Sequence, residues 1–205
     1  MFVSSPVPVN VARRRWGRAL MGVTCLGLSW PVWASMGGAA PGIDVHRLDV
    51  TRQDGALLLS VAVRPTLGRS IEEVLQRGIP LYFEAQATLY RPRWYWRDER
   101  LARVNRTWRL AYQPLTSSWR VSQGGALHQT VATLHEALAM ASRITDWRVS
   151  DADAVTPGDK SYIEFSYRLD NSQLPRPMQI DLVSMGDWRL EVERTVRVDP
   201  GRDTP

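Results

Sequence analysis

The chain contains a single cysteine, Cys25, among its 205 residues. Cys25 lies in an N-terminal segment that we expect to be removed after export, for reasons given below. Without it, the remaining chain has no disulfide, no cysteine nucleophile, no iron–sulfur cluster and no thiolate zinc site. The fold must therefore be held by a hydrophobic core, and about 170 residues suffice to form one without covalent links.

Motifs of common active sites are missing as well. The sequence has no G-x-S-x-G nucleophile elbow, no H-E-x-x-H metal motif and no glycine-rich phosphate loop. A metal or hydrolase site built from His128, His135 and Glu136 is one alternative, but histidines at this spacing are common by chance. We also expect Asp151 and Asp153 to lie in a solvated loop. The sequence therefore predicts a protein that is not an enzyme and holds no metal or cofactor.

Long apolar runs are absent too. The apolar segment at residues 19–28 is too short and too interrupted for a comfortable membrane span. Arginines precede it at positions 13, 14, 15 and 18, and residues 32–34 follow as a cleavage site. This order is typical of a secretory signal peptide. We expect cleavage after residue 34 and a periplasmic location, with retention of the segment as a membrane anchor as the alternative.

Lysine occurs once, at Lys160, so nearly all basic residues are arginines. Removal of residues 1–34 leaves 22 basic against 21 acidic residues, and the charge of the mature chain is almost balanced. This balance and the expected export argue against a nucleic-acid partner. Residues 35–42 predict a flexible linker, residues 43–198 a single domain and residues 199–205 a loose tail.

The sequence does contain segments in which apolar and polar residues alternate. Apolar residues at 81, 83, 85, 87 and 89 alternate with mostly polar ones, which predicts a half-buried strand. A second alternating run follows at 103–112 and a third strand at 118–122, with turn chemistry at 113–116 between them. Three consecutive strands with such links indicate an antiparallel meander.

Further strands lie on both sides of this meander. Residues 43–50 and 57–63 predict a hairpin around Asp54-Gly55, with a bulge between Val45 and Leu48. Later strands are expected at 162–170, 179–183 and 188–196.

Two short helices complete the pattern. Ser70 with Glu73, and Thr133 with Glu136, are spaced as capping boxes. Gly78 should end the first helix, and the second should extend its apolar side to residue 144. The pattern predicts a mainly β protein, an antiparallel β-sandwich with two short helices.

The link between the first two meander strands is unusually rich in aromatic residues and arginines. Five of its residues are candidates for binding a partner or ligand: Arg91, Arg93, Trp94, Trp96 and Arg97. The alternative is that Trp94 and Trp96 pack back on the sheet while the arginines pair with Asp98 and Glu99. We expect this second arrangement, because it is the more common fate of such segments.

Several motifs resemble the DUF4390 family of exported proteobacterial proteins. They are GIPLYF at 78–83, RPRWYW at 91–96, LAY at 110–112, GALHQ at 125–129, LHEAL at 134–138, DNSQLP at 170–175 and DW at 187–188. The resemblance implies an envelope protein, often encoded beside a nitrogen-type two-component sensor kinase and its regulator. It implies no catalytic residues.

Our first hypothesis is therefore an exported interaction module that binds an envelope or membrane protein, with a sensor kinase as one candidate. The alternative is a binding domain for an anionic or glycan-like small ligand, held by the same aromatic and arginine residues. The membrane would be contacted only through the leader, if the leader is kept.

Overall fold

The computed structural model describes residues 40–125, 128–156, 158–175 and 186–198. The chain separates into two units, residues 1–36 and 37–205, and all described residues belong to the second. The expected leader, residues 35–39 of the linker, the strand at 179–183 and the tail lie outside the described residues. Among the helices that are described, none has the length and apolar character needed to cross a membrane.

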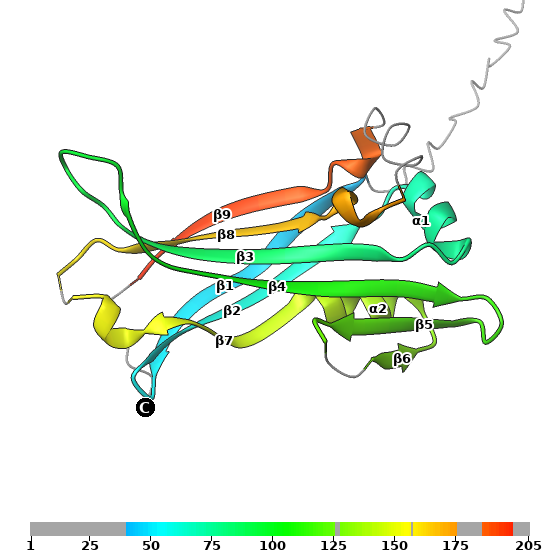
Figure 1. Ribbon diagram of the computed structural model, residues 1–205, viewed down its shortest axis with the longest axis horizontal. Coiled ribbons are helices and arrows are strands. Elements are labelled where there is room, and N and C mark those ends of the chain that lie inside the picture. The colour runs from blue at the N-terminus through cyan, green and yellow to red at the C-terminus, as the bar shows by residue number, and fades with distance from the viewer. Residues whose placement is uncertain (1–39, 126–127, 157, 176–185, 199–205) are drawn as a thin grey trace, which may run out of the picture. The chain divides into compact units, whose positions relative to one another are not determined.

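Nine strands and two α-helices are found in the described part of the chain (Figure 1). In chain order they are β1 (Gly42–Gln53), β2 (Ala56–Thr66), α1 (Arg69–Gln76), β3 (Leu81–Arg91), β4 (Glu99–Gln113), β5 (Ser118–Gln123), β6 (Gln129–Val131), α2 (Leu134–Ser142), β7 (Arg143–Asp151), β8 (Tyr162–Leu169) and β9 (Glu191–Arg197). Three short 3-10 turns are η1 (Ala152–Ala154), η2 (Asn171–Gln173) and η3 (Gly186–Trp188).

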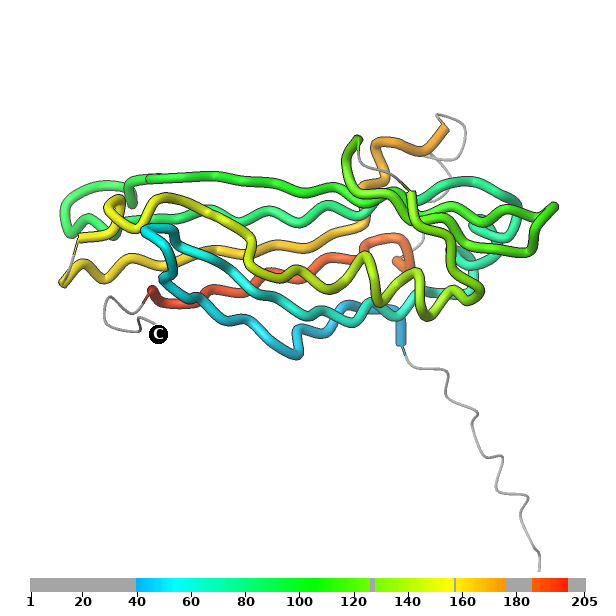
Figure 2. Tube along the Cα trace, turned by 90° about the horizontal axis from the view of Figure 1, so that it is seen from below, coloured from blue at the N-terminus to red at the C-terminus, as the bar shows by residue number. Residues whose placement is uncertain are grey.

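The strands form two open antiparallel sheets. The larger has the order β6-β5-β4-β3-β8-β9 and the smaller the order β1-β2-β7. Strands β1 and β2 run diagonally behind the larger sheet in Figure 1, and Figure 2 shows the β1–β2 and β3–β4 hairpins as separate layers. The predicted fold class, a mainly β sandwich with two short helices, is confirmed.

Side-chain alternation explains the core between the layers. The five apolar residues of β3 from Leu81 to Leu89 are all buried, as are the apolar residues of β8 from Ile163 to Leu169. The facing sheet contributes Leu57, Leu59 and Val61 from β2. Since side chains alternate between the two faces of a strand, the polar partners of these residues lie on the outside.

Strand β7 differs from the prediction, which extended the second helix to residue 144. The helix ends at Ser142, and Ile144, Trp147 and Val149 are buried in a strand that pairs with β2. The strand is irregular, because Asp146 has a positive φ of 47° and the register with β2 shifts twice. This irregularity interrupts the alternation by which a strand is recognised in a sequence.

The predicted capping box at Ser70 is wrong. Helix α1 begins at Arg69, and its N-cap is Gly68, two residues before Ser70, with no side-chain cap. The Asp187 side chain lies against Gly68 instead, so that a Cβ at Gly68 would come within 3.1 Å of Oδ2 of Asp187. A carboxylate at a helix N-terminus is favourable because it opposes the positive end of the helix dipole. The start of α1 therefore lies against η3, which is far away in sequence.

The other helix signals are confirmed. Gly78, with a φ of 82°, ends α1 in a Schellman motif, in which Gly78 and Ile79 donate to the carbonyls of Leu75 and Val74. Helix α2 has the predicted capping box, since Glu136 N–H donates to Thr133 Oγ1 over 3.2 Å and Thr133 N–H donates to Glu136 Oε2 over 3.2 Å.

Candidate functional site

The aromatic link lies at the end of the β3–β4 hairpin (left in Figure 1). Strands β3 and β4 pair from Leu81 opposite Leu110 to Arg91 opposite Glu99. The link is therefore shorter than expected from the sequence, and consists of residues 92–98, which we call the hairpin tip. All seven of these residues are exposed.

The aromatic side chains of the tip project into solvent. Trp94 is 95% exposed, Tyr95 64% and Trp96 74%. The expectation that Trp94 and Trp96 pack back on the sheet is thus wrong. Because strand pairing continues to Arg91 and Glu99, the tip begins only where the sheet ends. The aromatic rings contact each other instead, with Trp94 and Tyr95 meeting edge to face at 5.2 Å between ring centroids.

Two of the predicted site arginines hold the base of the tip. Arg93 Nη2 lies 2.6 Å from Oε2 of Glu99, and Arg91 Nη1 lies 3.6 Å from the same atom. Arg91 also donates to the Ala154 carbonyl over 3.0 Å and forms an ion pair, outside hydrogen-bond geometry, with Asp159 at 2.9 Å. The expected pairing with Glu99 is confirmed, and the charges of Arg91 and Arg93 are already neutralised within the protein.

Asp98, the last residue of the tip, connects the tip to β8. Its Oδ2 accepts a hydrogen bond of 2.6 Å from the Tyr162 hydroxyl, and its Oδ1 accepts the Arg93 backbone N–H at 3.3 Å. The Tyr162 ring stacks on Tyr90 with 5.4 Å between centroids. The hydrogen bond to Asp98 raises the pKa of Tyr162 to about 12. Since side-chain contacts hold both ends of the tip, its aromatic rings project from a rigid base.

The predicted site residues thus have two different roles. Trp94, Trp96 and Arg97 project from the tip, and Arg97 makes no hydrogen bond or ion pair with any described residue. Arg91 and Arg93 position the tip. Sequence reasoning missed Tyr162 and Asp159, because they come from a segment more than sixty residues away and carry no local signal.

A cleft of about 730 Å³ lies beside the base of the tip. It is lined by Pro92, by residues 159–162 and by Thr195, Arg197 and Val198. Among these lining residues, Pro92 alone comes from the tip, so the tryptophans and arginines of the predicted site do not line this cleft.

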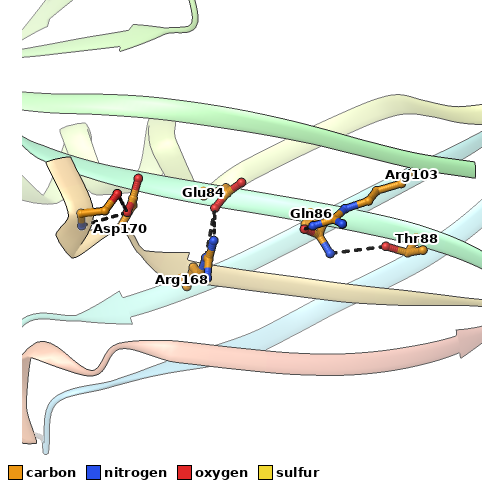
Figure 3. A network of polar contacts seen from close by, with 7 residues as sticks. Glu84, Gln86, Thr88, Arg103, Arg168 and Asp170 are labelled. Atoms are coloured by element: carbon orange, nitrogen blue, oxygen red, sulfur yellow. Dashed lines mark hydrogen bonds and ion pairs between the residues drawn. The ribbon is translucent and has the colours of Figure 1, made fainter.

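The outer face of the large sheet is occupied by contacts between its own polar side chains (Figure 3). Arg168 on β8 donates to Oε2 of Glu84 on β3 through Nη2 at 2.6 Å and Nε at 3.0 Å. Farther along β3, Arg103 donates to Gln86, which in turn donates to Thr88 over 3.4 Å. Cross-strand pairs of this kind stabilise a solvated sheet face. The exposed aromatic side chains therefore lie on the tip and not on this face.

Within the described ranges, no three His, Cys, Asp or Glu side chains form a group that could bind a metal ion. His128, His135 and Glu136 are thus not brought together as such a set. Glu136 caps α2, and His135 lines a cleft together with His46. Asp151, expected in a loop, is the last residue of β7 and forms an ion pair with Arg148.

The family described as "Domain of unknown function (DUF4390)" matches residues 40–198. This segment contains both sheets and the hairpin tip. No curated protein and no solved structure matches the chain.

Proposed function

This chain belongs to the DUF4390 family, and we propose that it is a non-enzymatic interaction module. Its leader would export it to the periplasm, where the hairpin tip binds a protein of the cell envelope. The periplasmic part of a sensor kinase is one candidate, because the family resemblance implies such a gene neighbourhood.

The observation that carries this proposal is the exposure of three consecutive aromatic residues on a fixed loop. Exposed apolar groups that gather in one place mark interaction sites. Tryptophan, tyrosine and arginine are also the residue types that dominate binding hot spots. The contacts of Glu99 and Asp98 fix the base of the tip, which lowers the entropy that is lost when a partner binds.

The charges around the tip favour a protein over a small anion. Residues 91–100 contain four arginines and two carboxylates, so the segment offers charges of both signs. Arg91 and Arg93 are already paired and have little charge left for a small anion. A protein surface with complementary charges of both signs fits this arrangement best.

Photocrosslinking in intact cells tests the proposal. A photoreactive phenylalanine analogue replaces Trp96 in one variant and Leu115 in another, since Leu115 is fully exposed in the β4–β5 turn. We expect a discrete crosslinked protein from position 96 that disappears when Trp94→Ala is added, and none from position 115. If purified protein instead floats with anionic vesicles and Trp94→Ala abolishes flotation, the tip binds lipid and the proposal is wrong.

A further inference from the structure

A second cleft lies on other elements than the tip. Its volume is about 340 Å³, and it is formed by β1, β2, α2 and the start of β7. Four basic residues line it, namely His46, Arg64, His135 and Arg143, and the remaining lining is mostly apolar. No acidic side chain of the described chain belongs to this lining. The cleft therefore combines positive charge with an apolar wall.

Sheet register explains why the two arginines meet. Ala62 and Arg64 alternate on β2 with the buried Val61 and Val63, so they point to the outer face. Arg143 is the direct partner of Ala62 across the β2–β7 pair. Arg64 is thus a diagonal neighbour of Arg143, at a Cα separation of about 7–8 Å. Two guanidinium groups on one face at this spacing can act on one anion.

The two histidines are positioned in the cleft by different elements, His46 by β1 and His135 by α2. On β1, Val45 pairs with Val63 and Arg47 with Ala62, which leaves His46 as the extra residue of a bulge. A bulge redirects a side chain, and bulges are frequent next to functional sites. On α2, His135 precedes Leu138 and Ala139 by about one turn, so the helix brings a donor and apolar surface together.

The two arginines of this cleft have no ion-pair partner among the described residues. Within the described residues, neither Arg64 nor Arg143 forms an ion pair or a hydrogen bond. Asp44 lies opposite Arg64 in the β1–β2 register without pairing with it, and Glu136 is engaged in the α2 cap. Arginines elsewhere, such as Arg93 and Arg168, have carboxylate partners.

We propose that this cleft binds a small organic anion, a carboxylate with a short apolar tail. Arg64 and Arg143 bind the carboxylate, because guanidinium groups match its planar geometry, and the imidazoles of His46 and His135 add donors. The tail packs on Ala62, Leu138 and Ala139. The volume lies at the small end of the range of about 300–1,000 Å³ for ligand sites, which suits a chain of about eight carbons.

Isothermal titration of the purified protein with octanoate tests this site. Octanol, which lacks the charge, and acetate, which lacks the tail, should bind at least tenfold more weakly than octanoate. The double variant Arg64→Gln, Arg143→Gln should weaken octanoate binding by roughly tenfold to a hundredfold, as loss of charge-assisted hydrogen bonds predicts. The matched control Arg109→Gln, an exposed arginine on β4, should leave it unchanged.

Circular dichroism of the double variant confirms that it is folded. Equal affinity for octanol and octanoate, or full affinity in the double variant, would overturn the proposal. The tip variant Trp94→Ala should bind octanoate normally, so this test and the crosslinking test can fail independently.

Discussion

Both ends of the β3–β4 hairpin carry aromatic side chains, but in different environments. The end opposite the tip, which contains Phe83 and Trp108, is called the root. At the root, Phe83 pairs across the strands with Trp108, and both are buried at 0% and 3% exposure. Tyr167 stacks on Phe83 with 5.7 Å between centroids. At the tip, Trp94 and Trp96 meet solvent. The same residue types thus stabilise the fold at one end and remain available for binding at the other.

The difference in exposure comes from the elements that pack against each end of the hairpin. The root faces the second sheet and α2, and the hydroxyl of the buried Tyr167 donates to the Ala141 carbonyl of that helix over 3.1 Å. The tip extends where strand pairing stops, and its seven residues are all exposed. Position relative to the second layer therefore decides the role of an aromatic residue in this protein.

The largest effect should follow from Phe83→Ala. Loss of this buried ring should lower the free energy of unfolding by about 3–5 kcal/mol, measured by urea denaturation. Trp96→Ala is the matched variant at the tip and should change it by less than about 0.5 kcal/mol. Comparable losses in both variants would remove the distinction between root and tip.

The next effect concerns binding. Trp94→Ala should weaken the affinity for the crosslinked partner by about 2 kcal/mol, or roughly thirtyfold, measured by titration on immobilised protein. Leu115→Ala is the control, since Leu115 is equally exposed but lies in the β4–β5 turn. An equal loss in both variants would show that general surface apolarity, and not the tip, determines binding.

A smaller effect separates two tyrosines. Tyr167→Phe removes a buried hydrogen bond and should lower the free energy of unfolding by about 1 kcal/mol. Tyr95→Phe removes an exposed hydroxyl of the tip and should leave stability unchanged. Thermal unfolding of the two variants measures the difference, and the reverse order of stabilities would contradict the assignment of the two residues.

The smallest effect concerns the base of the tip and pH. The pKa of Tyr162 is raised to about 12 because its hydroxyl donates to Asp98. In the unfolded chain the Tyr162 hydroxyl loses its proton at a lower pH than in the folded protein. The stabilisation by its hydrogen bond is therefore complete below the ordinary tyrosine pKa of about 10. It is lost as the pH rises through about 12.

Asp98→Asn should lower the pKa of Tyr162 toward its ordinary value. The difference in ultraviolet absorbance between each protein and its Tyr162→Phe counterpart measures the titration. An unchanged pKa would mean that Asp98 does not hold the base of the tip.

Features of the fold that depend on neighbouring residues could be predicted from the sequence. The alternation of β3 buries Phe83, the spacing of Thr133 and Glu136 caps α2, and the turn at Asp54-Gly55 has positive φ at both residues. Strand β7 was missed because Asp146 interrupts its alternation. The N-cap of α1 was assigned wrongly because the side chain that lies against Gly68, Asp187, is far along the chain.

The candidate site was only partly predictable for the same reason. The composition of residues 91–97 identified the aromatic and arginine side chains. Their exposure depends on how far β3 and β4 pair and on where the second layer ends, neither of which is a local property. The ties to Asp159 and Tyr162 likewise join segments more than sixty residues apart.

Radical footprinting with mass spectrometry tests the central claim most directly. It compares the oxidation of Trp94 and Trp96 in the purified protein with that in intact envelopes, and the buried Trp188 serves as the internal reference. We predict strong oxidation of both tip tryptophans in the purified protein, clear protection in the envelope and little oxidation of Trp188 in either. Equal oxidation of Trp94 and Trp96 in the two preparations would contradict a tip that is covered by a partner.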